Sequence, residues 1–172
     1  SLEQQGGSFQ HGVMKLLWLS FAAVFLLPFP ERLPAQEQKK TAKVARHSDL
    51  LVAKVGKTNL RLNLFVPENV ENPPLVIYIH GGGWRNGSYV KNLVPWLPQH
   101  GFALATIGYR LTDVETFPAQ IHDVKAAVRW LRAHGDKYGY NAKKIGVCGT
   151  SAGGHLALLI GTSGGVDALE GE

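Results

Sequence analysis

An α/β fold with a mostly parallel sheet and crossover helices is predicted by three features of this sequence. Short, continuous apolar runs at residues 74–79, 102–107 and 145–148 have the length and composition of buried strands. Between the second and third runs, residues 118–134 place apolar side chains three and four positions apart, which is typical of one face of a helix. Strands that alternate with helices of this length are joined by crossover connections, and such connections produce parallel strands.

The other elements are expected in chain order around these. A first strand is expected at residues 49–55 and a second at 60–66, where every second side chain is apolar, the period of a half-buried strand. A short helix is expected over 93–99, where two prolines limit its length. The long helix at 118–134 has a proline in its first turn and ends before Gly135.

The residue most suited to chemistry is a serine that follows the last strand run. Residues 145–148 lead directly into Gly149-Thr150-Ser151-Ala152-Gly153, then Gly154 and an apolar, helix-forming segment. In such a strand–turn–helix elbow the serine takes a strained backbone conformation, and the flanking glycines let strand and helix pack closely. We expect Ser151 to stand clear of the sheet, with free N–H groups of the first helical turn beside its oxygen.

A second glycine motif upstream supports this interpretation. His80-Gly81-Gly82-Gly83-Trp84 follows directly on the strand run at 74–79. In the lipase and esterase pattern, a loop at this place supplies one backbone N–H to the oxyanion hole, and the residue after the nucleophile supplies another. Here the donors would be Gly82 or Gly83, together with Ala152.

With both motifs in this order, the chain resembles an α/β-hydrolase of the bacterial carboxylesterase group related to hormone-sensitive lipase and to feruloyl-type esterases. The resemblance covers residues 48–172 and extends to three further segments, which are Leu64-Phe65-Val66-Pro67, Gly108-Tyr109-Arg110-Leu111 and residues 117–131. It implies the α/β-hydrolase fold and a serine esterase that cleaves a small-molecule carboxylic ester through an acyl-enzyme, with no cofactor or metal. The family often has an acid where this chain has Thr150 and an aspartate where it has Gly108, which affects local hydrogen bonding and not the serine.

The acid and base that a serine nucleophile needs are not found after Ser151. A serine hydroxyl needs an imidazole to take its proton, and that imidazole needs a carboxylate. In α/β-hydrolases the chain order is serine, acid, histidine, whereas here the one later histidine, His155, precedes every later acid. We therefore interpret the chain as the N-terminal part of a hydrolase, truncated after the elbow helix, and expect little or no turnover from it alone. The elbow strand, central in the family, would then be an open edge.

The remaining candidates for chemistry have simpler interpretations. His155 lies on the same helix face as Ser151, but helical side chains lean toward the N-terminus while the elbow serine projects above it, which disfavours His155 as the base. His80 is expected to shape its turn, and His122 and Asp123 to lie on the helix surface or pack against a loop. Trp84 either lines the entrance or packs, and packing is favoured.

Two alternative functions stay open at this point. A non-catalytic pseudo-hydrolase or gene fragment would bind a ligand or partner through the glycine-rich cleft. A serine peptidase of the same fold would use the same elbow and loop to cleave amides, and the sequence does not separate it from an esterase.

Composition and charge favour a single globular domain without a nucleic-acid partner or an internal disulfide. The 172 residues are 45% hydrophobic and 18% charged, which suits one globular domain. The net charge is +5, but the basic residues gather between Lys39 and Arg61 without interleaved aromatics, so we expect a solvated segment and no nucleic-acid partner. The single cysteine, Cys148, excludes an internal disulfide and is expected to be a buried structural thiol.

The N-terminal segment indicates export. Residues 1–13 are interpreted as a leader or upstream residues, and residues 14–35 as a signal peptide whose apolar run is shorter than the roughly 18 residues of a membrane span. Cleavage is expected after Ala35, an uncleaved membrane anchor being the alternative. Residues 36–47 would link this signal to the domain at 48–172, which we expect to be periplasmic or secreted and to have no membrane span once the signal is cleaved.

Overall fold

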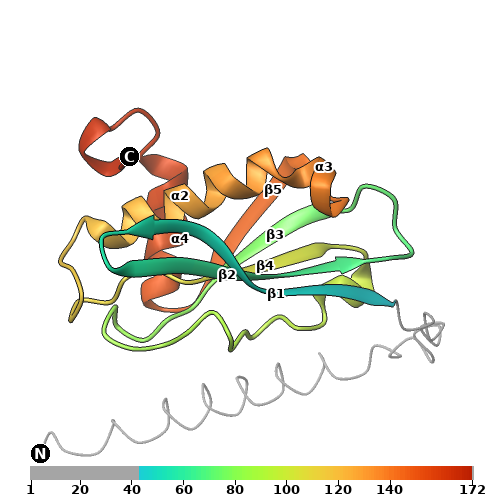
Figure 1. Cartoon of the computed structure of the whole chain (residues 1–172), viewed down its shortest axis with the longest axis horizontal. Helices are drawn as coiled ribbons and strands as arrows, with labels where there is room; N and C mark the ends of the chain where they lie inside the picture. The colour runs from blue at the N-terminus through green and yellow to red at the C-terminus, as the bar shows by residue number, and fades with distance from the viewer. Residues whose placement is uncertain (1–42, 172) are drawn as a thin grey trace, which may run out of the picture. The chain divides into compact units, whose positions relative to one another are not determined.

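A twisted sheet of five strands is the framework of the computed structural model, which describes residues 43–171 (Figure 1). The strand order is β1-β2-β4-β3-β5, and the parallel pairs are β3 with β4 and β3 with β5. The hairpin of β1 and β2 is antiparallel, as is the pairing of β2 with β4. The strands are β1 (Val44–Val55), β2 (Thr58–Pro67), β3 (Pro74–Ile79), β4 (Ala103–Ile107) and β5 (Asn141–Gly149).

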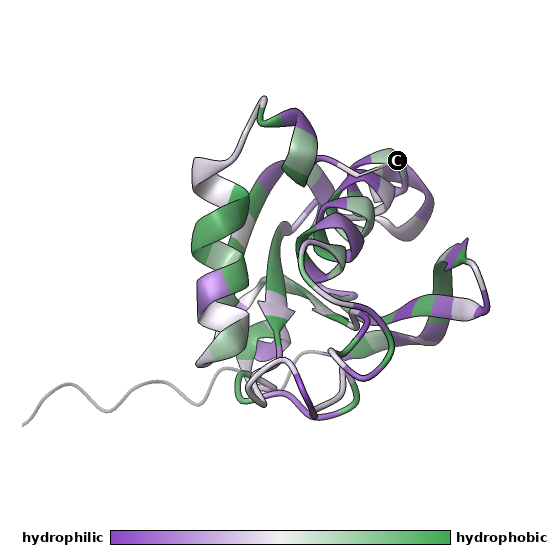
Figure 2. Ribbon diagram, turned by 90° about the vertical axis from the view of Figure 1, so that its left-hand side faces the viewer, coloured by the Kyte–Doolittle hydropathy of each residue, from purple (hydrophilic) through white to green (hydrophobic). Residues whose placement is uncertain are grey.

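The helices follow the parallel strands, as the alternating pattern predicts. The α-helices are α2 (Ala119–Ala133), α3 (Gly135–Tyr138) and α4 (Ala152–Thr162), and the 3-10 helices are η2 (Leu97–His100) and η3 (Asp167–Leu169). Figure 2 shows α4 as apolar over most of its length, although Leu158 on this helix is 73% exposed. None of the helices in residues 43–171 is both long and apolar enough to cross a membrane.

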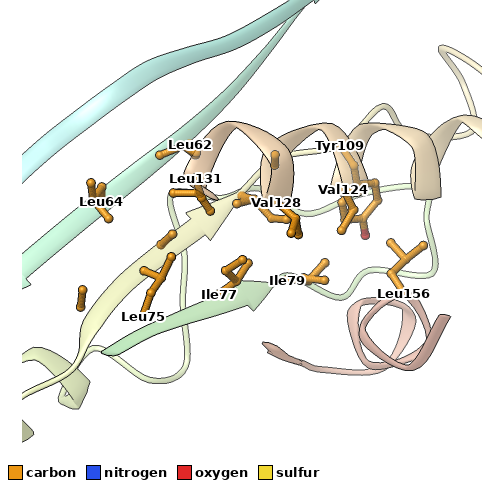
Figure 3. Close-up of a cluster of buried hydrophobic side chains, with 14 of the residues drawn as sticks. Leu62, Leu64, Leu75, Ile77, Ile79, Tyr109, Val124, Val128, Leu131 and Leu156 are labelled. Carbon is orange, nitrogen blue, oxygen red and sulfur yellow. The ribbon is translucent and has the colours of Figure 1, made fainter. Parts of the chain in front are cut away.

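The core lies between the sheet and α2 (Figure 3). Alternate residues of β2 and β3 point into it, because side chains in a strand alternate between the two faces of the sheet. They meet the apolar stripe that the sequence places on α2. From α4, Leu156 is buried in the same cluster, and Ala157, Leu159 and Ile160 pack against it half-buried. The labelled members are Leu62, Leu64, Leu75, Ile77, Ile79, Tyr109, Val124, Val128, Leu131 and Leu156.

Three predicted boundaries differ from the structure. β1 begins at Val44 and not at residue 49, so residues 44–47, expected in the linker, are strand residues that pair with the end of β2. The helix expected at 93–99 is reduced to the 3-10 helix η2, because prolines in this segment lack the N–H that an α-helix needs. β5 begins at Asn141, ahead of its apolar run, where Lys143 and Lys144 are exposed.

The predicted N-terminal segments lie outside residues 43–171, and the predicted position of the elbow strand agrees with the structure. The leader at 1–13, the signal peptide at 14–35 and the linker up to residue 42 lie outside the described residues. β5 is an edge of the described sheet, as expected for the elbow strand in this chain. Its residues Ile145 and Val147 are half-buried.

Candidate active site

Ser151 stands at the junction between β5 and α4. β5 ends at Gly149 and α4 begins at Ala152, so only Thr150 and Ser151 form the turn. The backbone of Ser151 has φ 50° and ψ −118°. A non-glycine residue with positive φ in this region is strained, by an energy on the order of 1–3 kcal/mol. The side chain is exposed, as the elbow motif predicts.

The glycines of the elbow are explained by close approach of backbones. A methyl group on Gly153 would contact the carbonyl of Ile79 and lie 2.6 Å from the carbonyl oxygen of His80. A methyl group on Gly149 would contact the backbone of Gly153, and one on Gly154 would lie 3.2 Å from the oxygen of Gly149. The start of α4 therefore rests directly on the end of β3, which brings the serine to the carboxyl edge of the sheet.

Residues 80–84, called here the glycine loop, follow β3 and lie against this elbow. A methyl group on Gly81 would lie 2.7 Å from the oxygen of Thr150 and 3.4 Å from Cβ of Ser151. Gly82 and Gly83 have φ of 119° and 60°, which glycine adopts without the strain of a side chain. The N–H groups of residues 85 and 86 donate to the oxygen of Gly82, each at 3.1 Å, and close the turn.

Several backbone N–H groups near Ser151 have no hydrogen-bond acceptor among residues 43–171. Among residues 43–171, the N–H groups of Gly82, Gly83 and Ala152 donate to no protein acceptor. Ala152 is the first residue of α4, where free N–H groups and the helix dipole together favour negative charge. The geometry therefore offers unpaired donors on both sides of the serine.

His80 is held by its neighbours and not by the serine. Its ring stacks on the ring of Tyr109, with centroids 4.4 Å apart, and its Nδ1–H donates to the oxygen of Gly81 at 2.8 Å. Tyr109 in turn donates its hydroxyl to the oxygen of His80 at 3.0 Å. Burial lowers the pKa of His80, although the bond to Gly81 opposes the shift. Burial also raises the pKa of Tyr109 to about 12. Both groups are therefore neutral near pH 7 and fix the base of the loop.

Tyrosine side chains account for both departures from the family pattern. The hydroxyl groups of Thr150 and Tyr78 are hydrogen-bonded at 3.1 Å, so the neutral residue before the serine still has a partner. A methyl group on Gly108 would lie 2.8 Å from Cδ1 of Tyr89, so the absence of a side chain at 108 makes room for that ring. Sequence reasoning missed Tyr78 and Tyr89 because neither belongs to a motif.

His155 is exposed, and its ring contacts Trp84, whereas a catalytic base would have to contact the hydroxyl of Ser151. Its ring meets the ring of Trp84 edge to face, with centroids 5.5 Å apart and planes at 88°. Trp84 is 36% exposed, so its ring has both a packing contact and a solvent face. No hydrogen bond within the described part of the chain joins Oγ of Ser151 to a histidine. Within residues 43–171 the site thus contains an exposed serine hydroxyl and unpaired N–H donors, but no imidazole that is hydrogen-bonded to the serine.

None of the other candidate side chains is hydrogen-bonded to Ser151 within residues 43–171. Asp123 is buried and accepts a bidentate bond from Arg110, and Nε2 of His122 is hydrogen-bonded to the oxygen of Ala168 at 2.9 Å. Cys148 is a free, half-buried thiol whose pKa is raised by burial. Within residues 43–171, no three His, Cys, Asp or Glu side chains are grouped so that they could hold a metal ion.

Several known proteins that resemble this chain are named as esterases. The family model described as BD-FAE matches residues 62–172. Esterase LipC of Mycobacterium tuberculosis is 38% identical over 91 residues, a match that covers 51% of this chain and 23% of that protein. Arylacetamide deacetylase of Oryctolagus cuniculus is 29% identical over 145 residues, which covers 79% of this chain and 34% of that protein.

Solved structures of esterases share the arrangement of strands and helices. A truncated form of a carbohydrate esterase from gut microbiota aligns with a TM-score of 0.68 at 28% identity, covering 81% of this chain and 52% of that chain. Esterase B from Lactobacillus rhamnosis aligns with a TM-score of 0.62 at 29% identity, covering 87% of this chain and 47% of that chain. The chain thus spans 23% and 34% of the length of the two curated relatives, and about half of the length of these structures.

Proposed function

This chain belongs to the BD-FAE family and has the α/β-hydrolase fold, and from this premise we propose that it is a serine hydrolase of the carboxylesterase type. One observation carries the proposal. Ser151 has a strained backbone at the tip of a strand–turn–helix elbow, directly beside the glycine loop. Its substrate would be a small-molecule carboxylic ester, the class of bond that the name of esterase LipC implies.

In the proposed reaction, Oγ of Ser151 attacks the ester carbonyl carbon while its proton passes to an imidazole. The carbonyl oxygen becomes negatively charged, and the unpaired N–H groups of Ala152 and of Gly82 or Gly83 stabilise it. Loss of one such donor typically costs about 2.7–4 kcal/mol in the transition state. The alcohol then leaves with the proton, and water hydrolyses the acyl-enzyme by the same route.

The imidazole and its carboxylate are proposed to come from chain that this sequence does not contain. Two observations support this. His155, the one histidine after Ser151, is paired with Trp84, and the two relatives are about three and about four times as long as the part of them that this chain matches. The 172-residue chain expressed alone should therefore show little or no turnover.

The test compares two serine variants at opposite ends of α4 in the full-length native protein. Ser151→Ala should abolish both hydrolysis of p-nitrophenyl esters and covalent labelling by a fluorophosphonate probe. Ser163→Ala is the matched control, because Oγ of Ser163 is buried without a hydrogen-bond partner among residues 43–171 and its loss should leave labelling unchanged. Labelling that persists in Ser151→Ala would exclude Ser151 as the nucleophile.

The same assays separate the alternatives. Labelling of Ser151 with turnover of amides and not of esters would indicate a peptidase. A full-length protein that is neither labelled nor active would indicate a non-catalytic hydrolase relative.

We also propose that the protein is exported. The proposal rests on the predicted signal peptide at 14–35, which lies outside the described residues. Fractionation of the native cells, with intact mass of the mature protein, tests it, and a cytoplasmic protein that retains residues 14–35 would contradict it.

A further inference from the structure

We propose that Trp84 and His155 form a positioning pair that holds the glycine loop against the first turn of α4. The inference rests on the proposed function, because it concerns how the N–H donors are kept in place around Ser151. Both residues would act through the backbone and not by touching the substrate.

The backbone of Trp84 is the first observation. Its φ is 59°, a left-handed conformation that is unfavourable for a bulky side chain. Gly83 has nearly the same φ, and a methyl group there would meet nothing within 4 Å. Such a conformation persists at a non-glycine residue only where its surroundings hold it, and it concentrates at functional sites. Residue 84 therefore needs a compensating contact, which the tryptophan ring can supply.

The ring contact is the second observation. An edge-to-face pair with centroids 5.5 Å apart lies within the favourable range for aromatic rings. On the other side, the N–H of Thr112 donates to the oxygen of Trp84 at 2.9 Å. Trp84 is thus held by its ring toward α4 and by its carbonyl toward the loop that follows β4.

The place of His155 explains why this contact bears on the serine. The N–H of His155 donates to the oxygen of Ser151 at 3.0 Å, so the imidazole lies one helical turn beyond the nucleophile. The free N–H of Ala152 lies in that same turn. The pair therefore joins the two elements that carry the unpaired donors, and a displacement of about 1 Å between such groups can cost about 100-fold in rate.

The chain contains a matched control for this pair. Trp96 and His100 meet edge to face at the same centroid distance of 5.5 Å and at 85°. They lie just before β4 begins, whereas the glycine loop follows the end of β3, and these strands are parallel. Trp96 and His100 therefore stand at the opposite end of the sheet from Ser151.

The first test measures kcat and KM for a p-nitrophenyl ester in the full-length protein. Trp84→Ala and His155→Ala should each lower kcat by roughly tenfold, a fraction of the 100-fold cost of a full displacement, and change KM by less than twofold. The double variant should lose little more than either single variant, because both remove the same contact. Trp84→Phe should restore most of the rate and Trp96→Ala should retain all of it. Additive losses, or an equal loss in Trp96→Ala, would contradict the pair.

The second test does not depend on activity. Hydrogen–deuterium exchange of peptides covering residues 80–86 should be faster in Trp84→Ala and His155→Ala than in the parent, and unchanged in Trp96→Ala. Unchanged exchange in the first two variants would overturn the pair even if Ser151 is the nucleophile. If Ser151→Ala instead keeps full activity, the proposed function fails while the exchange result still decides whether the pair holds the loop.

Discussion

Gly153 lies in the first turn of α4, where the helix backbone closely approaches the end of β3, the strand that leads into the glycine loop. A side chain there would meet the carbonyl of Ile79 at the end of β3, and carbonyl groups of a strand cannot move aside as a flexible side chain can. Gly161, on the same helix, has open space around the position of its missing methyl group. One helix thus contains one glycine that packing requires and one that it does not.

This contrast predicts opposite effects of the same substitution at Gly153 and Gly161. Gly153→Ala should lower the free energy of unfolding by about 1–3 kcal/mol, the usual cost of overpacking, and should reduce fluorophosphonate labelling of Ser151. Gly161→Ala should raise the free energy of unfolding by about 0.5–1 kcal/mol, because alanine is favoured over glycine inside a helix. Urea denaturation of the two variants measures both effects. Equal effects of the two substitutions would show that the contact with β3 does not constrain residue 153.

Helix α2 is hydrogen-bonded to the loop at residues 108–118, and that loop is hydrogen-bonded to the glycine loop. Asp123 on α2 accepts bonds from the side chain and the N–H of Arg110, and Gln120 donates to the oxygen of Arg110 at 3.1 Å. The same loop supplies the N–H of Thr112 that binds Trp84. A continuous set of hydrogen bonds therefore runs from the core helix to the candidate site.

The ion pair between Asp123 of α2 and Arg110 is buried, and we expect it to stabilise the fold. The side chain of Asp123 is 2% exposed and that of Arg110 is 13% exposed, so neither charge is well hydrated. Asp123→Asn leaves a buried guanidinium without its counter-charge and should lower the free energy of unfolding by about 3–5 kcal/mol.

The exposed pair of Lys43 and Glu68 provides the control. Its side chains are 85% and 40% exposed, and Glu68→Gln should change the free energy of unfolding by less than about 1 kcal/mol. Thermal or urea unfolding of both variants measures the difference. A loss in Asp123→Asn no larger than in Glu68→Gln would show that the buried pair does not anchor the loop.

At the scale of the whole described domain, residues 43–171, the pKa values of His80 and Glu170 are lowered, and they make stability depend on pH in two separate ranges below neutrality. Burial lowers the pKa of His80 from its ordinary 6.5, so below that pH the unfolded chain gains a proton that the folded chain does not. The bond from Lys125 lowers the pKa of Glu170 from its ordinary 4.5, so its contribution is present above that pH and is lost as the pH falls through the lowered value. Both effects reduce stability on acidification.

We therefore expect the free energy of unfolding to fall as the pH drops below 6.5 and to fall further below 4.5. His80→Asn should flatten the first range and Glu170→Gln the second, as measured by urea denaturation in a series of buffers. The contribution of Glu170 should also weaken in high salt, because its ion pair is reached by solvent. A parent protein whose stability does not change between pH 7 and 5 would contradict the assignment to His80.

The local elements and the nucleophile elbow could be predicted from the sequence alone. The period of two in residues 60–66 and the helical stripe of α2 are properties of consecutive residues, and both elements were found within a few residues of their predicted ends. The elbow was predictable because its glycines and serine are adjacent in the chain, and Ser151 has the strained backbone that this spacing requires. Hydrophobic period and local backbone geometry are thus fixed by neighbours in sequence.

Tertiary structure decided the contacts between residues that are far apart in the chain. The sequence around Val44 has no alternating apolar pattern that would predict a strand. Residues 44–47 form one because they pair with the end of β2. The contact of Trp84 with His155, the bond between Tyr78 and Thr150, and the space that Gly108 leaves for a ring likewise depend on how strands and loops meet. The sequence determined which residue is the candidate nucleophile and which loop faces it. Only packing decided what holds that loop, because a contact between distant residues leaves no period or motif at either one.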